Sequence, residues 1–348
     1  MRIAIANDDT SMGPGDLDCR FGAAQLAPEL LARALAARGH EVWRVSGYKP
    51  TVEPGGGVLY VRPTDKVDAV IANRRIDWVD MVEATTSFAW VHDAWGHNLG
   101  HFKARPHVRI VAVSLWQARN LATALAGVAV PWGVIPVGAA AELAEHAIVP
   151  GKRVYTSGMW VECRGTLRAV EAFCLAAHRV QGLTLHMYGD EKLWGATRDA
   201  YGHKVLDTVA KSGTHIELCG TVPYPEMLKA LPRMSIFLHP ATAETCWVSG
   251  AEAALAGKPI VSRVEGAQGE RGYADTTDGS VEQMAERIVA FAEDDDLYRA
   301  AARQNRCAAR HLTWPAVAAQ WEHAIECALG GSGDACTGSG TCLRGQPD

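Results

Sequence analysis

The sequence contains no long hydrophobic run. No apolar stretch approaches the roughly 20 residues that a helix needs to cross a bilayer. Met1-Arg2 runs directly into the apolar stretch IAIAN, without the successive charged, apolar and small-residue regions of a signal peptide. We therefore expect a cytoplasmic protein without a transmembrane segment.

Paired cysteines are also missing. No C-x-x-C pair occurs, and the nine cysteines stand singly, several of them in apolar segments, at positions 19, 163, 174, 219, 246, 307, 327, 336 and 342. This spacing favours reduced, buried cysteines over a disulfide framework or a zinc site. We therefore expect no bound metal.

A basic excess is absent as well. The chain has 34 Lys and Arg against 39 Asp and Glu, for a net charge of −5. Bulk charge therefore gives no support for a nucleic-acid partner, which stays open but is not favoured. The stretch 97–109, HNLGHFKARPHVR, is a local exception without an acidic residue. It suits an anionic acceptor or lipid headgroups at a membrane surface, with Phe102 inserted beside them, or else it is a solvated crossover loop.

What the sequence does contain is an alternation of apolar strands and helices over 348 residues, enough for two domains. In the first half we expect strands at 2–7, 41–47, 58–62, 68–73, 87–92 and 109–114, and helices at 22–39 and 115–127. In the second half we expect strands at 153–158, 183–189, 214–220, 234–240 and 259–264, and helices at 164–180, 224–231, about 244–257 and within 281–329. Alternation of this kind is typical of parallel sheets covered by helices.

The pattern stops and restarts once, which predicts two Rossmann-like, doubly wound parallel sheets. We place the first domain at 1–138, a linker at 139–152 and the second domain at 153–312. The last helix, 313–329, begins with an N-cap threonine and an early proline, and we expect it to pack back on the first domain. The Gly/Ser-rich residues 330–348 read as a disordered tail.

Two glutamates, Glu244 and Glu252, lie between the strand that ends at Pro240 and the helix that runs to Gly257. A helix advances about 100° per residue, so their spacing of eight would put the first carboxylate at the helix mouth and the second on nearly the same face. A helix that follows a strand of an open α/β sheet points its N-terminus at the crevice where such sheets bind ligands. Carboxylates suit ribose and hexose hydroxyls, and the free N–H groups of a helix end suit a diphosphate.

Seven segments in order resemble one family. They are RFGAAQLAPELLARALAARGHEV, VAVSLWQARNL, VIPVG, SGMWVECRGTLRAVEAF, LHMYGD, IELCGTVPYPEMLKAL and HPATAETCWVSGAEAALAGKPIVS. From Met1 to about Leu329 the chain resembles the retaining GT-B glycosyltransferases of the group 1, or family 4, type. The resemblance implies the GT-B fold, in which two Rossmann-like domains face each other across a cleft. It implies that the donor binds the second domain and the acceptor mainly the first.

The same resemblance implies a hexosyltransferase-like enzyme. It would move a sugar from a nucleoside diphosphate sugar to an acceptor hydroxyl with retention of anomeric configuration, and it would need neither a metal nor another cofactor. Glu252 would accept hydrogen bonds from the donor ribose, and Glu244 would lie near the transferred sugar and the diphosphate. The further donor-binding residues implied are Gly158 after the first strand of the second domain, Val222 and Pro223 at the nucleobase, and Thr245 and Cys246 at the phosphates.

Arg164 matches one of the two cations that the family places on the diphosphate. It would stabilise the negative charge that develops on the leaving group. The other cation is missing, because Met159 stands where the family has an arginine. Either activity is reduced, or another cation such as Lys192 or Arg20 supplies the second charge.

The first domain offers candidates for the acceptor side. The loop after the first strand contains Gly13, Gly15 and Gly22, whose backbone would approach the phosphate or the acceptor, or serve only the turn. Asp16 and Asp18 in this loop suit an acceptor hydroxyl, or are solvated charges. Their D-x-D pattern follows Gly-Pro-Gly rather than a strand, which disfavours a metal site.

His92 ends the strand 87–92. At this position, enzymes of the family that the chain resembles often have a histidine near the primary hydroxyl of the sugar or near the acceptor. Asp93 would orient it. The alternative for His92 is a hydrogen-bonded structural histidine.

Other functions stay open on the same fold, because fold does not determine function. The chain could be a nucleotide-sugar epimerase or hydrolase. The loss at Met159 also fits a catalytically impaired partner subunit that binds a nucleotide sugar. For a transferase, a small molecule, a glycan and a lipid-linked sugar all stay open as acceptors.

Overall fold

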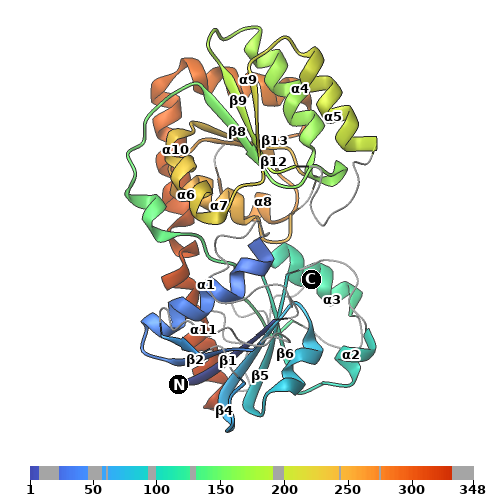
Figure 1. Ribbon diagram of the computed structural model, residues 1–348, viewed down its shortest axis with the longest axis vertical. Coiled ribbons are helices and arrows are strands. Elements are labelled where there is room, and N and C mark those ends of the chain that lie inside the picture. Colours follow the sequence, from blue (N-terminus) through green and yellow to red (C-terminus); the bar gives the residue numbers. More distant parts are fainter. Residues whose placement is uncertain are drawn as a thin grey trace, which may run out of the picture. The chain divides into compact units, whose positions relative to one another are not determined.

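The computed structural model describes residues 1–7, 23–45, 57–59, 62–92, 99–125, 131–190, 200–242, 244–273 and 276–330. The chain divides into two compact units (Figure 1). Unit 1 contains the described residues up to Gly138 together with those from Leu312 onward, and unit 2 is Ala139–His311. Each unit has its own parallel sheet and its own helices.

Unit 1 has a seven-stranded parallel sheet in the order β3-β2-β1-β4-β5-β6-β7. Its strands are β1 Arg2–Asn7, β2 Glu41–Val45, β3 Val58–Leu59, β4 Val67–Asn73, β5 Ala84–Val91, β6 Arg109–Ala112 and β7 Gly133–Val134. The central strands β1 and β4 are nearly all apolar and buried, as expected for parallel strands covered on both faces. The strand order reverses at β1, which pairs with β2 on one side and β4 on the other.

The helices of unit 1 include one from the far end of the chain. They are α1 Ala23–Ala37, η2 Ile76–Met81, α2 Leu99–Lys103, α3 Leu115–Ala124 and α11 Trp314–Leu329. Helix α11 packs against α1 and β5 (Figure 1). Its Trp321 meets the rings of Phe88 and Trp90 edge-on, both at 5.6 Å between centroids, and its Glu322 forms an ion pair with Arg38 of the turn after α1.

Unit 2 has a six-stranded parallel sheet in the order β10-β9-β8-β11-β12-β13. Its strands are β8 Arg153–Ser157, β9 Thr184–Tyr188, β10 Ile216–Gly220, β11 Ile236–His239, β12 Ile260–Arg263 and β13 Thr276–Thr277. Its helices are η3 Ala141–Glu145, η4 Glu162–Arg164, α4 Thr166–Ala177, α5 Ala200–Lys211, α6 Tyr224–Ala230, η6 Leu231–Arg233, α7 Val248–Leu255, α8 Ala267–Glu270, α9 Val281–Glu293 and α10 Asp295–Ala309, and η7 Arg310–Leu312 leads into α11.

The core of unit 2 lies between its sheet and the helices α4 and α9, which pack on each other. Phe173 of α4 and Ile288 of α9 are fully buried there with the strand residues Leu185 and Leu238. The order of this sheet reverses at β8, which pairs with β9 and β11. Ligands of doubly wound sheets bind at such switch points, beyond the carboxyl ends of the strands.

The predicted fold class is confirmed, since both units are doubly wound parallel sheets. Some predicted boundaries are wrong. Helix α4 begins at Thr166, not at residue 164, because Gly165 takes the left-handed conformation with φ 70°. The short elements β13 and α8 have no counterpart in the prediction, since segments of two and four residues carry no periodic pattern.

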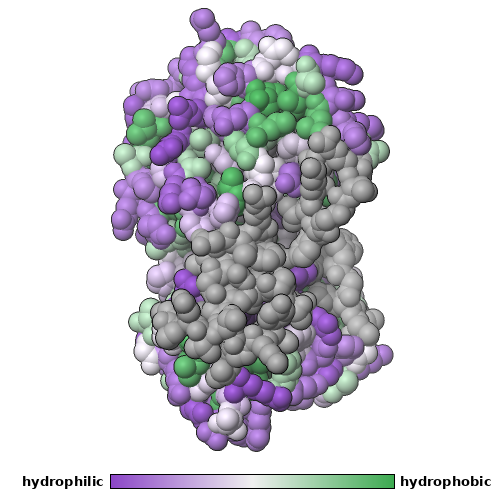
Figure 2. All heavy atoms as spheres, in the orientation of Figure 1, coloured by the Kyte–Doolittle hydropathy of each residue, from purple (hydrophilic) through white to green (hydrophobic). Residues whose placement is uncertain are grey.

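Within the described residues, no helix is both long enough and apolar enough to cross a membrane. Figure 2 shows hydrophilic residues spread over the described part of one face, with smaller apolar areas between them.

Candidate functional site

Two loops of unit 2 are held together beyond the carboxyl ends of β8 and β11. Gly165, after β8, has φ 70°, and a Cβ added there would lie 2.5 Å from the carbonyl oxygen of Pro240, after β11. The Thr242 N–H donates to the carbonyl oxygen of Cys163 at 2.9 Å. Only glycine satisfies both the backbone conformation and the lack of space at position 165. The two loops are therefore in direct contact, and side chains from both meet there.

Arg164 and Glu244 are the first of these side chains. Arg164 Nη1 forms an ion pair with Glu244 Oε1, and His239 Nε2 lies 2.8 Å from the same carboxylate oxygen. Glu244 is 7% exposed, whereas the Arg164 side chain is 35% exposed. A buried carboxylate thus pairs with an arginine whose side chain is only partly exposed.

Burial sets the charges of this group. Burial, together with the nearby charge of Arg164, lowers the pKa of His239 to about 3. Glu244 by itself would favour a protonated ring, but its charge is already balanced by Arg164, so we take His239 as neutral and as donating from Nε2. Burial also lowers the pKa of Arg164, which stays protonated because a guanidinium titrates far above neutral pH.

Glu252 lies in α7 and is 7% exposed. The Tyr224 side chain, at the start of α6, is hydrogen-bonded to it, and Oε1 of Glu252 has no hydrogen-bond partner among the described residues. Burial raises the pKa of Glu252 to about 7, and the bond from Tyr224 offsets only part of this rise. A buried oxygen without a donor is costly, and it matches a ligand hydroxyl.

The predicted placement of both glutamates on one helix is wrong. Helix α7 begins at Val248, so Glu244 lies in the loop before it and helical periodicity does not relate it to Glu252. The loop ends at Trp247, which has φ 59° and stacks on Phe237, with the rings tilted by 28°. A Cβ at Gly250 would lie 2.3 Å from the Trp247 ring, so glycine is required beneath it.

The other predicted donor residues of unit 2 lie at loop and helix ends. Gly158, after β8, has φ 144°, and its carbonyl oxygen would lie 2.0 Å from a Cβ on Gly189, after β9. Val222 is half-buried, and the next residue, Pro223, caps α6 just before Tyr224.

Thr245 is half-buried and Cys246 is buried, both in the loop that carries Glu244. The Cys246 carbonyl accepts a hydrogen bond from Arg271 Nη2 at 3.2 Å. A second cation of unit 2 is therefore fixed against this loop.

The candidates of the first domain are less well defined. His92 directly follows β5 in unit 1, is 4% exposed and contacts the Trp90 ring, with 4.6 Å between centroids. Its predicted partner Asp93, the loop residues Gly13, Gly15, Asp16, Asp18 and Gly22, and the candidate cations Arg20 and Lys192 lie outside the described residues.

The basic stretch 97–109 is balanced by acids that the sequence pattern does not reveal. Arg105 forms an ion pair with Asp80, and His101 Nδ1 lies 3.7 Å from an Asp77 carboxylate oxygen. Phe102 is 3% exposed and belongs to the core of unit 1, so its predicted insertion beside lipid headgroups is wrong.

Tyr224, His239 and Arg271 were not predicted as site residues. Two of them border features that the sequence does show, since His239 ends a strand before Pro240 and Tyr224 follows Pro223 at a helix start. Arg271 had no sequence signal, because its contact with Cys246 comes from a part of the chain 25 residues away.

The second unit matches a known family. Residues 151–294 match the family model described as "Glycosyl transferases group 1". A search among curated protein sequences gives no significant match.

Solved structures are similar over nearly the whole chain. The glycosyltransferase AviGT4, involved in avilamycin A biosynthesis, is 16% identical, with a TM-score of 0.69 over 95% of this chain and 98% of that one. Anabaena Alr3699/HepE in complex with UDP and glucose is 14% identical, with a TM-score of 0.69 over 94% and 99%. Sucrose-phosphate synthase from Thermosynechococcus elongatus is 14% identical, with a TM-score of 0.70 over 95% and 99%. At such identities the likeness shows the fold, which is GT-B.

Proposed function

We propose that the chain is a glycosyltransferase that moves a sugar from a nucleoside diphosphate sugar to an acceptor hydroxyl with retention of anomeric configuration. The match of residues 151–294 to the model of group 1 glycosyltransferases supports this proposal. The donor site would be formed by Arg164, Glu244 and Glu252 of unit 2. UDP-sugars are the first donors to test, since a similar structure, Anabaena Alr3699/HepE, was solved with UDP-glucose.

One observation carries the donor assignment. Glu252 is buried, and its Oε1 has no partner among the described residues. It lies in α7, the helix that follows the loop with Glu244, which is paired with Arg164. A ribose hydroxyl that donates to Oε1 would satisfy it and would favour the charged carboxylate. We propose that Val222 and Pro223 contact the nucleobase and that Gly158, Thr245 and Cys246 line the phosphates.

Arg164 would stabilise the leaving diphosphate. The Arg164 side chain is 35% exposed, and with Nη1 bound to Glu244 its other N–H groups would donate to a phosphate. Charged donors positioned before the reaction are commonly the largest contribution to such catalysis. The proposed transfer therefore needs no metal, and addition of EDTA should leave the rate unchanged.

The bond changes are those of a front-face substitution. The bond from the anomeric carbon to the diphosphate oxygen breaks, and the acceptor oxygen bonds to the same face of that carbon. The acceptor proton passes to the departing phosphate oxygen. Glu244 already contacts Arg164 and His239, which favours a positioning role over that of a covalent nucleophile. We propose that His92 in unit 1 serves the acceptor side.

Another residue can supply the positive charge that is missing at position 159, where Met159 replaces the arginine of the family. Arg271 lies against the loop of Glu244 through its bond to the Cys246 carbonyl. We propose that its guanidinium contributes the second positive charge at the diphosphate. Replacing Arg271 by Ala should then weaken diphosphate binding more than binding of the nucleoside alone.

Thermal unfolding with UDP, GDP, ADP or TDP tests the proposal, because a ligand that binds the native state raises the melting temperature. We expect one nucleotide to raise it selectively, and Arg164→Ala to lose this shift. The matched control is Arg168→Ala, since Arg168 is an exposed residue of the same segment. Equal shifts in wild type and Arg164→Ala would remove the donor-site assignment.

Product analysis separates the alternative functions. Incubation with donor alone would yield an epimerised or free sugar stoichiometrically if the chain were an epimerase or hydrolase. Selective nucleotide binding without turnover on any donor and acceptor pair would favour an impaired partner subunit. This alternative is suggested by Met159, which replaces an arginine of the family. A new glycosidic bond of the donor's anomeric configuration is the expected result.

A further inference from the structure

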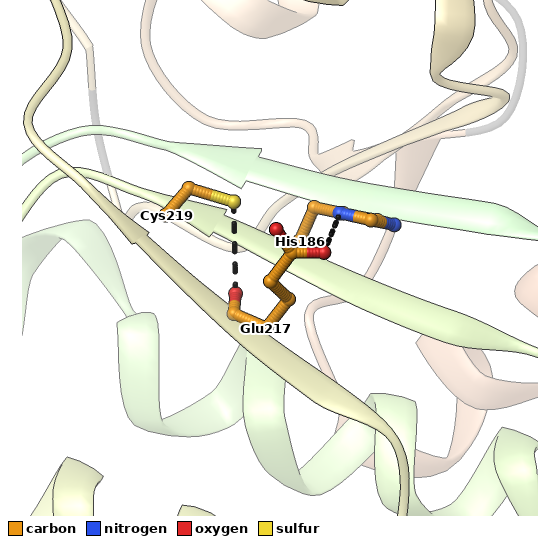
Figure 3. A group of neighbouring side chains, drawn as sticks. All are labelled: His186, Glu217 and Cys219. Atoms are coloured by element: carbon orange, nitrogen blue, oxygen red, sulfur yellow. Dashed lines mark hydrogen bonds and ion pairs between the residues drawn. The ribbon is translucent and has the colours of Figure 1, made fainter.

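The edge of the unit 2 sheet carries a cluster that the donor site does not use. His186 lies in β9, and Glu217 and Cys219 lie in the edge strand β10 (Figure 3). His186 Nδ1 is 3.0 Å from a Glu217 carboxylate oxygen, and one ligand atom from each of the three residues lies within 4.8 Å of the other two. Imidazole, carboxylate and thiolate are all zinc ligands.

The backbone explains why these side chains converge. His186 and Glu217 are direct partners in the parallel ladder, so they share one face of the sheet. The register shifts between Leu218 and Gly220, which leaves Cys219 as an extra residue in β10. Bulges of this kind redirect a side chain, and Gly220 takes the positive φ of 67° at this point.

Two neighbouring side chains support the cluster. The Thr184 hydroxyl lies 3.2 Å from His186 Nε2, the ring nitrogen that faces away from Glu217. A histidine that binds a metal through one nitrogen normally donates the other N–H to such a partner, and a hydroxyl can accept it. The Tyr188 side chain is hydrogen-bonded to the Cys219 thiol.

We propose that His186 Nδ1, a Glu217 carboxylate oxygen and Cys219 Sγ bind Zn²⁺, with water as the fourth ligand. The thiol would lose its proton to solvent on binding, so thiolate and carboxylate together balance the two charges of the ion. Glu217 is 58% exposed and the His186 side chain 13% exposed, so the ion can enter from the Glu217 side. The expectation of no metal rested on the lack of C-x-x-C spacing, which does not apply to ligands from two strands.

The proposed zinc would clasp β10 to β9 and leave the transfer chemistry alone. Strand β9 is separated from β11, which ends near Glu244, by β8 alone. Two strand spacings correspond to about 10 Å, so an ion bound to His186 would be too far away to contact Glu244 as well. Zinc binding is therefore testable without any assumption about the donor.

The first test measures bound zinc in the full-length protein after equilibration and gel filtration. Wild type should hold one equivalent more than Cys219→Ser and His186→Ala, with at least about a tenfold loss of affinity in each variant. The matched controls are Cys307→Ser and His203→Ala, which remove an exposed thiol and an exposed imidazole elsewhere in unit 2. Glu217→Gln provides a third variant, because an exposed side chain can be replaced without disturbing the fold.

The second test locates the ion. Zn²⁺ should slow alkylation of Cys219, measured by peptide mass spectrometry, and leave the alkylation rate of Cys307 unchanged. It should also raise the melting temperature of wild type and not that of Cys219→Ser or Glu217→Gln. Equal zinc content in wild type and Cys219→Ser, or an unchanged alkylation rate at Cys219, would overturn the proposal.

Discussion

Replacing Glu252 by Gln should make the stability of the protein less sensitive to pH. The pKa of Glu252 is about 7 in the folded protein against an ordinary value of 4.5, because burial disfavours the charged form. Between these values the folded state holds a proton that the unfolded state has released. The free energy of unfolding of wild type therefore falls as pH rises through this window.

The size of this effect follows from the shift. The difference of 7 − 4.5 pKa units corresponds to about 3 kcal/mol as an upper limit, at about 1.4 kcal/mol per unit. The glutamine side chain stays neutral at every pH, so the variant lacks this loss. A new amide N–H beside the unpartnered position adds a constant cost of about 1–3 kcal/mol at all pH values. The quantity to test is therefore how the difference in free energy of unfolding between Glu252→Gln and wild type changes with pH, not the size of that difference at any one pH.

Urea unfolding of wild type and Glu252→Gln at pH 5, 6, 7 and 8 measures this difference. We expect the free energy of unfolding of the variant, relative to wild type, to rise by up to about 3 kcal/mol from pH 5 to pH 8, at unchanged m-value. Glu226→Gln is the control, because Glu226 is an exposed residue of α6 paired with Lys229. A difference that stays constant from pH 5 to pH 8 would refute the assignment of a buried, protonated Glu252.

Three further predictions concern the same site. Arg164→Lys should weaken nucleotide diphosphate binding about tenfold in a calorimetric titration, because an ammonium lacks the planar fork that binds Glu244 and a phosphate together, and unchanged affinity would contradict this role. Because the pKa of His239 is low in the folded protein, only the unfolded state binds a proton at this residue between about pH 6.5 and pH 3. In acid unfolding curves, wild type should therefore lose stability towards pH 3 more steeply than His239→Asn. Gly165→Ala should lower the free energy of unfolding by more than Gly182→Ala: both glycines have positive φ, but only at Gly165 would a Cβ meet another backbone atom, and equal losses would exclude the clash.

The fold was predictable because it is recorded in local patterns. The continuous apolar strands β1 and β4 identify a buried parallel sheet without any long-range information. The edges of elements were less predictable, since Gly165 and Trp247 each end a loop through a positive φ that periodicity does not reveal. A tryptophan with φ 59° is a genuine outlier, and the Trp247 ring packs against the rings of Phe237 and His239.

The sequence predicts candidate residues for the site, but not the contacts that these residues make. Glu244, Glu252 and Arg164 stand out by type and position, and the structure brings Arg164 and Glu244 into one ion pair. The partner of Glu252, Tyr224, comes from another segment, and His239, five residues before Glu244, ends a buried strand without a pattern that marks it as a partner. The same reason hid the cluster at the edge of the unit 2 sheet, because its ligands lie on neighbouring strands about 30 residues apart in sequence.

The pairing of Arg164 with Glu244 bears on how one cation can act at the diphosphate. A guanidinium has five N–H donors in a planar fork, and the ion pair with Glu244 engages Nη1. The buried carboxylate, held in turn by His239, therefore restrains the position of the guanidinium before a ligand arrives. A positioned donor needs little reorganisation as negative charge develops, which is the condition for electrostatic stabilisation of a leaving group. Glu244 would then raise the transfer rate through Arg164, so Glu244→Gln should lower kcat more than it weakens nucleotide binding.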